Sequence, residues 1–145
     1  MRTGATFALA LLMTAPVLVS AQVPNPTESM GSHYKTPEEK AMEAYARGMR
    51  SKRKAEGEKD PQKQAKLYLK AKEELSKSVG YQGHYDGYLA LGQVYLALGK
   101  QESAFDACSH AQFLKPNDET AKSCVEEARR KIREASTKKP GDGGR

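Results

Sequence analysis

The sequence predicts an all-α protein built from stacked antiparallel helical hairpins. No segment shows the two-residue alternation of a half-buried strand, and helix-start and helix-stop signals recur along the chain. An internal repeat predicts that the helices form stacked hairpins, because a set of small and apolar residues that begins at Ala71 matches a second set that begins at Ala104, 33 residues later. The 145 residues, 38% hydrophobic and 29% charged, suit one small domain with polar ends.

The first 21 residues, MRTGATFALALLMTAPVLVSA, have the pattern of a cleavable secretory signal peptide. One cation, Arg2, precedes an apolar run, and small residues at the end of the run suit cleavage after Ala21. The run is shorter than the roughly 20 residues that cross a bilayer, which disfavours a membrane-spanning helix. We therefore expect a periplasmic or secreted protein, with a polar disordered linker over residues 22–35 and a similar tail over residues 136–145.

Two helices are predicted in a first repeat, residues 36–84. Thr36 and Pro37 start the first helix, because a hydroxyl N-cap followed by proline is favoured at that place. Asp60 and Pro61 start the second helix in the same way. Small and apolar residues then follow at helical spacing, namely Ala41, Tyr45, Gly48 and Met49 in the first helix and Tyr68, Ala71, Leu75, Ser78 and Val79 in the second.

A second repeat, residues 85–118, is predicted to hold two shorter helices. The third helix runs from about Asp86 to Leu98, and the fourth from about Gln101 to Leu114. A fifth helix, residues 119–135, carries a single narrow apolar stripe, which is typical of a terminal capping helix.

Small residues are expected wherever two of these helices approach closely. We predict that four of them are buried at such contacts: Ala71, Gly92, Ala104 and Ala111. Larger side chains are expected to fill the space around them, namely Tyr88, Leu91, Tyr95 and Leu114.

The second repeat resembles a tetratricopeptide repeat in its sequence motif, which comprises Tyr88, Leu91, Gly92, Tyr95, Gly99, Ala104, Cys108, Ala111 and Pro116. The first repeat resembles it less closely, because Gly48 and Ala71 are 23 residues apart where Gly92 and Ala104 are 12 apart. We expect both helices of the first repeat to be extended, so that their far end projects beyond the stack. The resemblance implies a right-handed solenoid of about two repeats plus the capping helix, residues 36–135.

The resemblance also implies a binding function, because partner segments dock on the surface lined by the first helix of each hairpin. The candidate partner-binding residues are Tyr45, Met49, Lys52 and Arg53 on the first helix and Asp86, Leu89, Gln93 and Leu96 on the third. Each is also compatible with an ordinary helix surface, and the two leucines with filling the stack. Two units and a cap are few for such a fold, so we expect it to need additional stabilisation. This could come from a disulfide, from the long hairpin, from a protein partner or from a second copy of the chain.

A basic segment of the first helix suggests an alternative function. Five of the eight residues from Arg47 to Lys54 are cations and none is an acid, and Arg47, Arg50 and Lys54 share one helical face. The candidate basic patch is Arg47, Arg50, Arg53 and Lys54. Such a face suits an anionic membrane, a cell-wall polymer or an acidic partner, and it is equally compatible with a solvated surface. No aromatic residue is interleaved with the cations, so nucleic acid is not an expected partner.

Cys108 and Cys124 are the only cysteines, and they fall on consecutive predicted helices. In an oxidising compartment we expect a disulfide that pins the last helix, and the alternative is two buried thiols. No catalytic or phosphate-binding motif is present, and His33, His84 and His110 lack metal-ligand spacing. The sequence therefore predicts a non-enzymatic protein-interaction scaffold with no cofactor and no metal.

Overall fold

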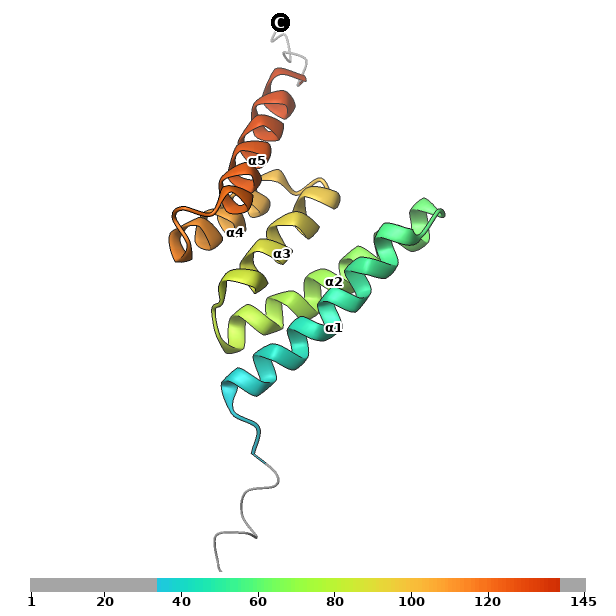
Figure 1. Ribbon diagram of the computed structural model, residues 1–145. Helices are drawn as coiled ribbons and strands as arrows, with labels where there is room; N and C mark the ends of the chain where they lie inside the picture. Colours follow the sequence, from blue (N-terminus) through green and yellow to red (C-terminus); the bar gives the residue numbers. More distant parts are fainter. Residues whose placement is uncertain (1–33, 139–145) are drawn as a thin grey trace, which may run out of the picture. The chain divides into compact units, whose positions relative to one another are not determined.

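A computed structural model describes residues 34–138, so the expected signal peptide, most of the expected linker and residues 139–145 lie outside the described range. The chain divides into Met1–Tyr34 and Lys35–Arg145, and every described helix belongs to the second unit. The helices are α1 (Pro37–Gly57), α2 (Pro61–Tyr81), α3 (Tyr85–Ala97), α4 (Gln101–Leu114) and α5 (Glu119–Lys138), as Figure 1 shows. Because residues 34–138 contain no strand, the predicted all-α class is confirmed there. None of these five helices is long and apolar enough to span a bilayer.

The first two helices begin at the capping residues that the sequence predicts. Thr36 Oγ1 accepts a hydrogen bond from the Glu39 N–H at 3.2 Å, and the Glu39 carboxylate accepts one from the Thr36 N–H at 2.8 Å. This reciprocal pair satisfies two backbone donors at the start of α1. At the start of α2, Asp60 Oδ1 accepts hydrogen bonds from the backbone N–H groups of Gln62 and Lys63.

α1 and α2 pack along one another as a long first hairpin (Figure 1). Their close approach requires small residues, because a Cβ atom at Gly48 would lie 2.6 Å from Leu75 Cγ. Near the open end of the hairpin, the buried Ser78 hydroxyl donates to the Ala41 carbonyl at 2.7 Å. At the other end the hairpin extends away from α3 in Figure 1, and no residue of positions 50–67 belongs to an apolar core cluster.

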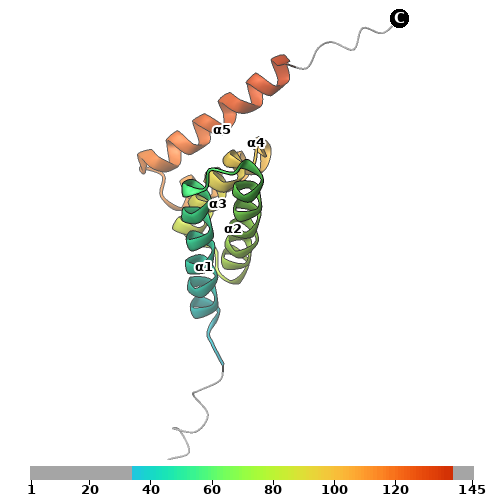
Figure 2. The same cartoon turned by 90° about the vertical axis from the view of Figure 1, so that its right-hand side faces the viewer.

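The remaining helices continue the series, with α3 packed on α2, α4 on α3, and α5 on α4. A first core cluster joins α2, α3 and α4 and consists of Ala71, Leu75, Ala90, Leu91, Val94 and Ala107. A second, which we call the disulfide cluster, joins α4 and α5 and consists of Cys108, Cys124 and Val125. The C-terminal half of α5 extends past the other helices in both views (Figures 1 and 2).

The internal repeat is reproduced in the burial of α2 and α4. Six matching side chains are 0% exposed, namely Ala71, Leu75 and Ser78 in α2 and Ala104, Cys108 and Ala111 in α4. Gly92 is buried as well, and a Cβ atom there would overlap the Sγ atom of Cys108. The prediction that four small residues are buried at helix contacts is therefore confirmed.

Two details differ from the sequence predictions. Leu114 was expected to fill the core, but it is 44% exposed because it is the last residue of α4 and the buried stripe of that helix ends at Ala111. α5 continues to Lys138, three residues beyond the predicted end at Ala135. Its apolar stripe contributes buried residues only as far as Ala128, since Ala135 is exposed.

Candidate functional site

One predicted partner-binding residue, Tyr45, lies where α1 touches the start of α3, and two others, Arg53 and Asp86, are near enough for their charges to affect it. Tyr45 of α1 is half-buried, and its ring meets the ring of His84 edge-on, with 5.4 Å between the centroids. The charges of Arg53 on α1 and Asp86 on α3 both act on the Tyr45 hydroxyl. Arg53 and Asp86 are exposed and come from two different helices. We call the surface that carries Tyr45, Arg53 and Asp86 the α1–α3 face; the predicted residue Gln93 is half-exposed and lies two turns beyond Asp86 on α3.

The pKa of Tyr45 shows how these groups influence one another. Burial raises the pKa of the hydroxyl because it disfavours the phenolate, and the negative charge of Asp86 raises it further. The positive charge of Arg53 acts in the opposite direction. Tyr45 therefore stays protonated at neutral pH and is available to donate a hydrogen bond.

His84 supports Tyr45 from the start of α3. Its Nδ1 atom lies 3.0 Å from the Gln82 carbonyl oxygen, while its Nε2 atom is buried without a hydrogen-bond partner in the described part of the chain. The ring lies against Gly87, where a Cβ atom would come within 2.7 Å of His84 Cε1. The glycine thus leaves room for the ring on which Tyr45 packs.

The other predicted partner-binding residues are used partly by the fold. Met49 packs against the first core cluster, and Leu89 and Leu96 pack against the disulfide cluster. Lys52 is paired with Glu56 at 2.6 Å, and its side chain is only 14% exposed. The two leucines therefore pack inside the helical stack, which is one of the two interpretations that the sequence left open. The side chains that remain on the α1–α3 face are mainly polar.

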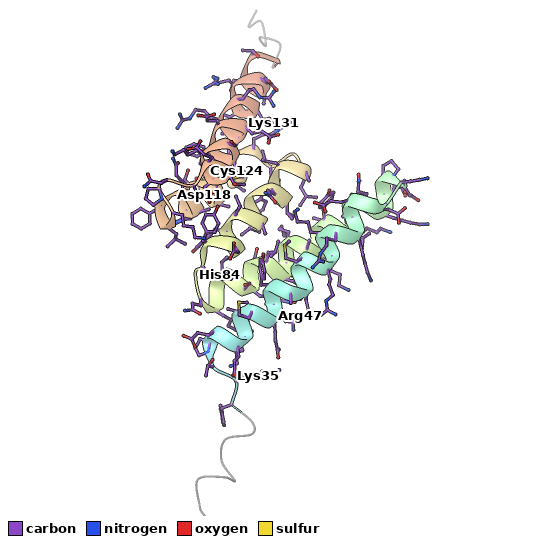
Figure 3. The ribbon with its side chains drawn as sticks, in the orientation of Figure 1. Lys35, Arg47, His84, Asp118, Cys124 and Lys131 are labelled. Atoms are coloured by element: carbon purple, nitrogen blue, oxygen red, sulfur yellow. A yellow bond between two sulfur atoms is a disulfide. The ribbon has the colours of Figure 1, made fainter. Side chains whose placement is uncertain are left out.

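The predicted basic patch divides between two sides of α1. Arg47, Arg50 and Lys54 line a cleft of about 270 Å³ between α1 and α2, whereas Arg53 acts on Tyr45 of the α1–α3 face. Ser51 of α1 and Lys70 and Glu74 of α2 complete the lining of this basic cleft. Figure 3 labels Arg47 on the first hairpin.

Within the basic cleft, Arg47 is neutralised by acids. Its Nε atom donates to Glu74 Oε2 at 2.5 Å, and a second nitrogen lies 3.8 Å from a Glu43 oxygen. The pair raises the pKa of Arg47 and lowers the pKa of Glu74, chiefly through this hydrogen bond. Arg50, Lys54 and Lys70 form no ion pair with any residue of the described range.

The sequence reasoning missed the contribution of α2 to this cleft. Lys63, Lys66 and Lys70 recur at intervals of three and four, so they share one face of α2. That stripe was visible in the sequence. Only the pairing of the two helices reveals that it adjoins the basic stripe of α1.

Two interactions tie α5 to the preceding helices. Cys108 of α4 and Cys124 of α5 are joined by a disulfide, the pair expected from the sequence, with a Cα–Cα distance of 5.7 Å. Asp118 caps α5 by accepting hydrogen bonds from two of its first backbone N–H groups, and its carboxylate lies near enough to the Tyr85 hydroxyl of α3 to raise the pKa of that hydroxyl. Figure 3 labels Asp118 and Cys124 on this side of the chain. The start of α5 is thus held covalently and by the interaction of Asp118 with Tyr85.

No protein-family model, curated protein or solved structure matches this chain. Over residues 34–138, no three His, Cys, Asp or Glu side chains are grouped so as to hold a metal ion, and His33 lies outside this range. A functional assignment therefore depends on the two surfaces described above, the α1–α3 face and the basic cleft.

Proposed function

We propose that this chain is a non-enzymatic adaptor of the periplasm or the extracellular space, which binds a segment of a partner protein across the α1–α3 face. Its helices form a tetratricopeptide-like right-handed solenoid of two hairpins and a capping helix. One observation carries the proposal: Tyr45 of the first hairpin packs against His84 at the start of α3, and the charges of Arg53 and Asp86, which come from the two hairpins, both act on its hydroxyl. This contact brings the first helices of the two hairpins to one surface.

The buried pattern supports the repeat architecture. Equivalent positions of α2 and α4 are fully buried at an offset of 33 residues, from Ala71 to Ala104, as expected when one structural unit is used twice. In such stacks the first helices of successive units lie on the same side. α1 and α3 hold these positions in the two hairpins, and they carry the site.

The recognition chemistry of the α1–α3 face is polar. Asp86 suits a cationic side chain of the partner, Arg53 suits a carboxylate, and the Tyr45 hydroxyl donates a hydrogen bond to an acceptor between them. Opposite charges side by side select the register of a bound segment more than they add to its affinity. Tyrosine and arginine are also the residue types that dominate binding energy at protein interfaces.

Reversal of one charge tests this function. In Asp86→Arg the face loses its anion and gains a second cation, so we expect the capture of the physiological partner to fall about tenfold or more. The immobilised full chain is incubated with an extracytoplasmic extract of the source cells, and the retained proteins are measured by quantitative mass spectrometry. Asp106→Arg is the matched control, because Asp106 is an exposed aspartate on α4.

A partner that the wild type and the control retain and that Asp86→Arg loses supports the proposal. If all three proteins retain the same set in the same amounts, the α1–α3 face is not the binding site. Circular dichroism of both variants shows whether the helices remain intact. Both aspartates are exposed, so we expect no change in helicity.

A further inference from the structure

The net positive charge of the described residues is concentrated at the far end of the first hairpin. Residues 50–70 contain eight Lys or Arg and three Asp or Glu, which leaves a net charge of +5. Residues 35–49 and 71–138 together contain 13 of each kind and are neutral. We call residues 50–70 the basic finger. It gives the helical unit one positive end, so the chain approaches an anionic surface in a preferred orientation.

Among the cations of the basic finger, Arg50, Lys54 and Lys70 have no acidic partner in the described range, whereas Lys52 is paired with Glu56 and Lys63 with Asp60. Arg50 and Lys54 come from α1 and Lys70 from α2, and all three are exposed around the basic cleft. Lys63 and Lys66 extend the same face along α2. The cations therefore form a two-dimensional patch, in contrast to the single line that α1 alone would provide.

The lining of the basic cleft indicates the kind of partner. Its six residues are all polar or charged, namely Arg47, Arg50, Ser51, Lys54, Lys70 and Glu74. A protein interface normally draws its affinity from a few buried aromatic or apolar anchors, and this lining offers none. A flat array of anions such as a bilayer surface can instead engage all the cations of the patch together, because each one near the surface is attracted independently.

We infer that the basic finger binds the phosphate headgroups of an anionic phospholipid surface, with one headgroup phosphate seated in the basic cleft among Arg50, Lys54 and Lys70. An arginine supplies paired N–H donors to phosphate oxygens, and the two lysines supply mobile point charges. Ser51 also lines the cleft and is 7% exposed.

This contact leaves the proposed protein-binding surface free. The basic cleft opens beside Arg50 and Lys54, while Tyr45 lies on the part of α1 that meets α3. Attachment to a membrane through the basic cleft and capture of a protein segment therefore use different sides of the first hairpin, and Arg53, although it lies within residues 50–70, belongs to the protein-binding side.

Sedimentation of the full chain with lipid vesicles tests the inference. One set of vesicles contains phosphatidylcholine alone, and the other contains equal parts of phosphatidylcholine and phosphatidylglycerol. We expect binding to the anionic set at an ionic strength of about 0.01 M and its loss at about 1 M, where the screening length falls from roughly 30 to 3 Å. The triple variant Arg50→Gln, Lys54→Gln, Lys70→Gln should bind the anionic vesicles about 100-fold more weakly, because three surface cations are removed.

The matched control removes three exposed cations from α5, in the variant Arg129→Gln, Arg130→Gln, Arg133→Gln. Both triple variants have the same net charge and the same residues 1–34, so any contribution of that segment is equal in them. We expect the α5 variant to bind nearly as tightly as the wild type. Equal weakening of both variants would show that only net charge matters, and it would overturn the inference.

A second part of the experiment distinguishes a lipid surface from an acidic protein as the partner of the basic finger. Polyglutamate offers carboxylates on a flexible chain without phosphate. If polyglutamate binds in a manner that depends on the basic finger while anionic vesicles do not bind, the inference is overturned in favour of an acidic protein partner. This inference is independent of the proposed protein-binding function. The Asp86→Arg variant should bind vesicles like the wild type, so a loss of vesicle binding can be told apart from a loss of protein binding at the α1–α3 face.

Discussion

The first hairpin and the part of the chain from α3 to α5 bury similar patterns of small residues, but they are stabilised in different ways. The first hairpin relies on Gly48 against Leu75 and on the buried hydrogen bond from Ser78. The region of α3 to α5 has shorter helices in its hairpin and closes its end with the disulfide between Cys108 and Cys124. The first region therefore has no covalent constraint, and the second has one next to its core.

The two regions also differ in charge. The basic finger holds all of the net positive charge of the described residues, whereas residues 82–138 contain eight Lys or Arg and eight Asp or Glu. A hairpin that extends beyond its neighbours can carry unbalanced charge, because its cations remain solvated there and core packing is unaffected. This difference fits the two proposals above, in which the first hairpin contributes to contacts with other molecules, and it sets them against the covalently constrained region of α3 to α5.

The largest predicted effect concerns the residue that joins the two regions. Leu75 is 0% exposed and belongs to the core cluster shared by α2, α3 and α4. Leu75→Ala should lower the free energy of unfolding by about 3–5 kcal/mol, because it removes buried methyl groups and leaves a cavity. Leu69→Ala is the control on the same helix, and since Leu69 is 46% exposed we expect a change within about 0.5 kcal/mol. Urea denaturation measures both, and equal losses would show that Leu75 does not join the regions.

The second prediction removes the covalent constraint. The disulfide closes a separation of 16 residues, and the double variant Cys108→Ala, Cys124→Ala should lose about 3 kcal/mol in urea denaturation. Hydrogen exchange sharpens the comparison, since amides of α5 should lose protection before those of α1 and α2. Equal loss of protection in all helices would mean that the two regions unfold as one unit.

The features predicted from sequence alone are those set by local chemistry. The start of α1 follows from Thr36 and Pro37, because capping depends on residues within one turn. The burial of Ala71 and Ala104 follows from helical periodicity, which places residues at fixed intervals on one face. The pairing of Cys108 with Cys124 needed only that two neighbouring helices pack together.

The features that were missed depend on the register between helices. Arg47 is separated from Glu74 by 27 residues, and no local pattern indicates that they meet. The contribution of Lys70 to the basic cleft has the same origin, because it depends on how α2 lies beside α1. Leu114 was misplaced since periodicity identifies a face of a helix but not how far a neighbour covers it.

The smallest predicted effect concerns the interaction between Tyr85 and Asp118. Burial, followed by the interaction with the Asp118 carboxylate, raises the pKa of Tyr85 from 10.0 to about 12, so the folded state keeps the proton that the unfolded chain loses. Tyr85→Phe should cost up to about 1 kcal/mol at neutral pH. The stabilisation from the raised pKa is complete below pH 10 and is lost as the pH rises through about 12, so the difference between wild type and variant should shrink over that interval. Urea denaturation across this range measures it, with Tyr34→Phe as the control because Tyr34 is 93% exposed. A difference that stays constant from neutral pH to pH 12 would show that folding does not raise the pKa of the Tyr85 hydroxyl.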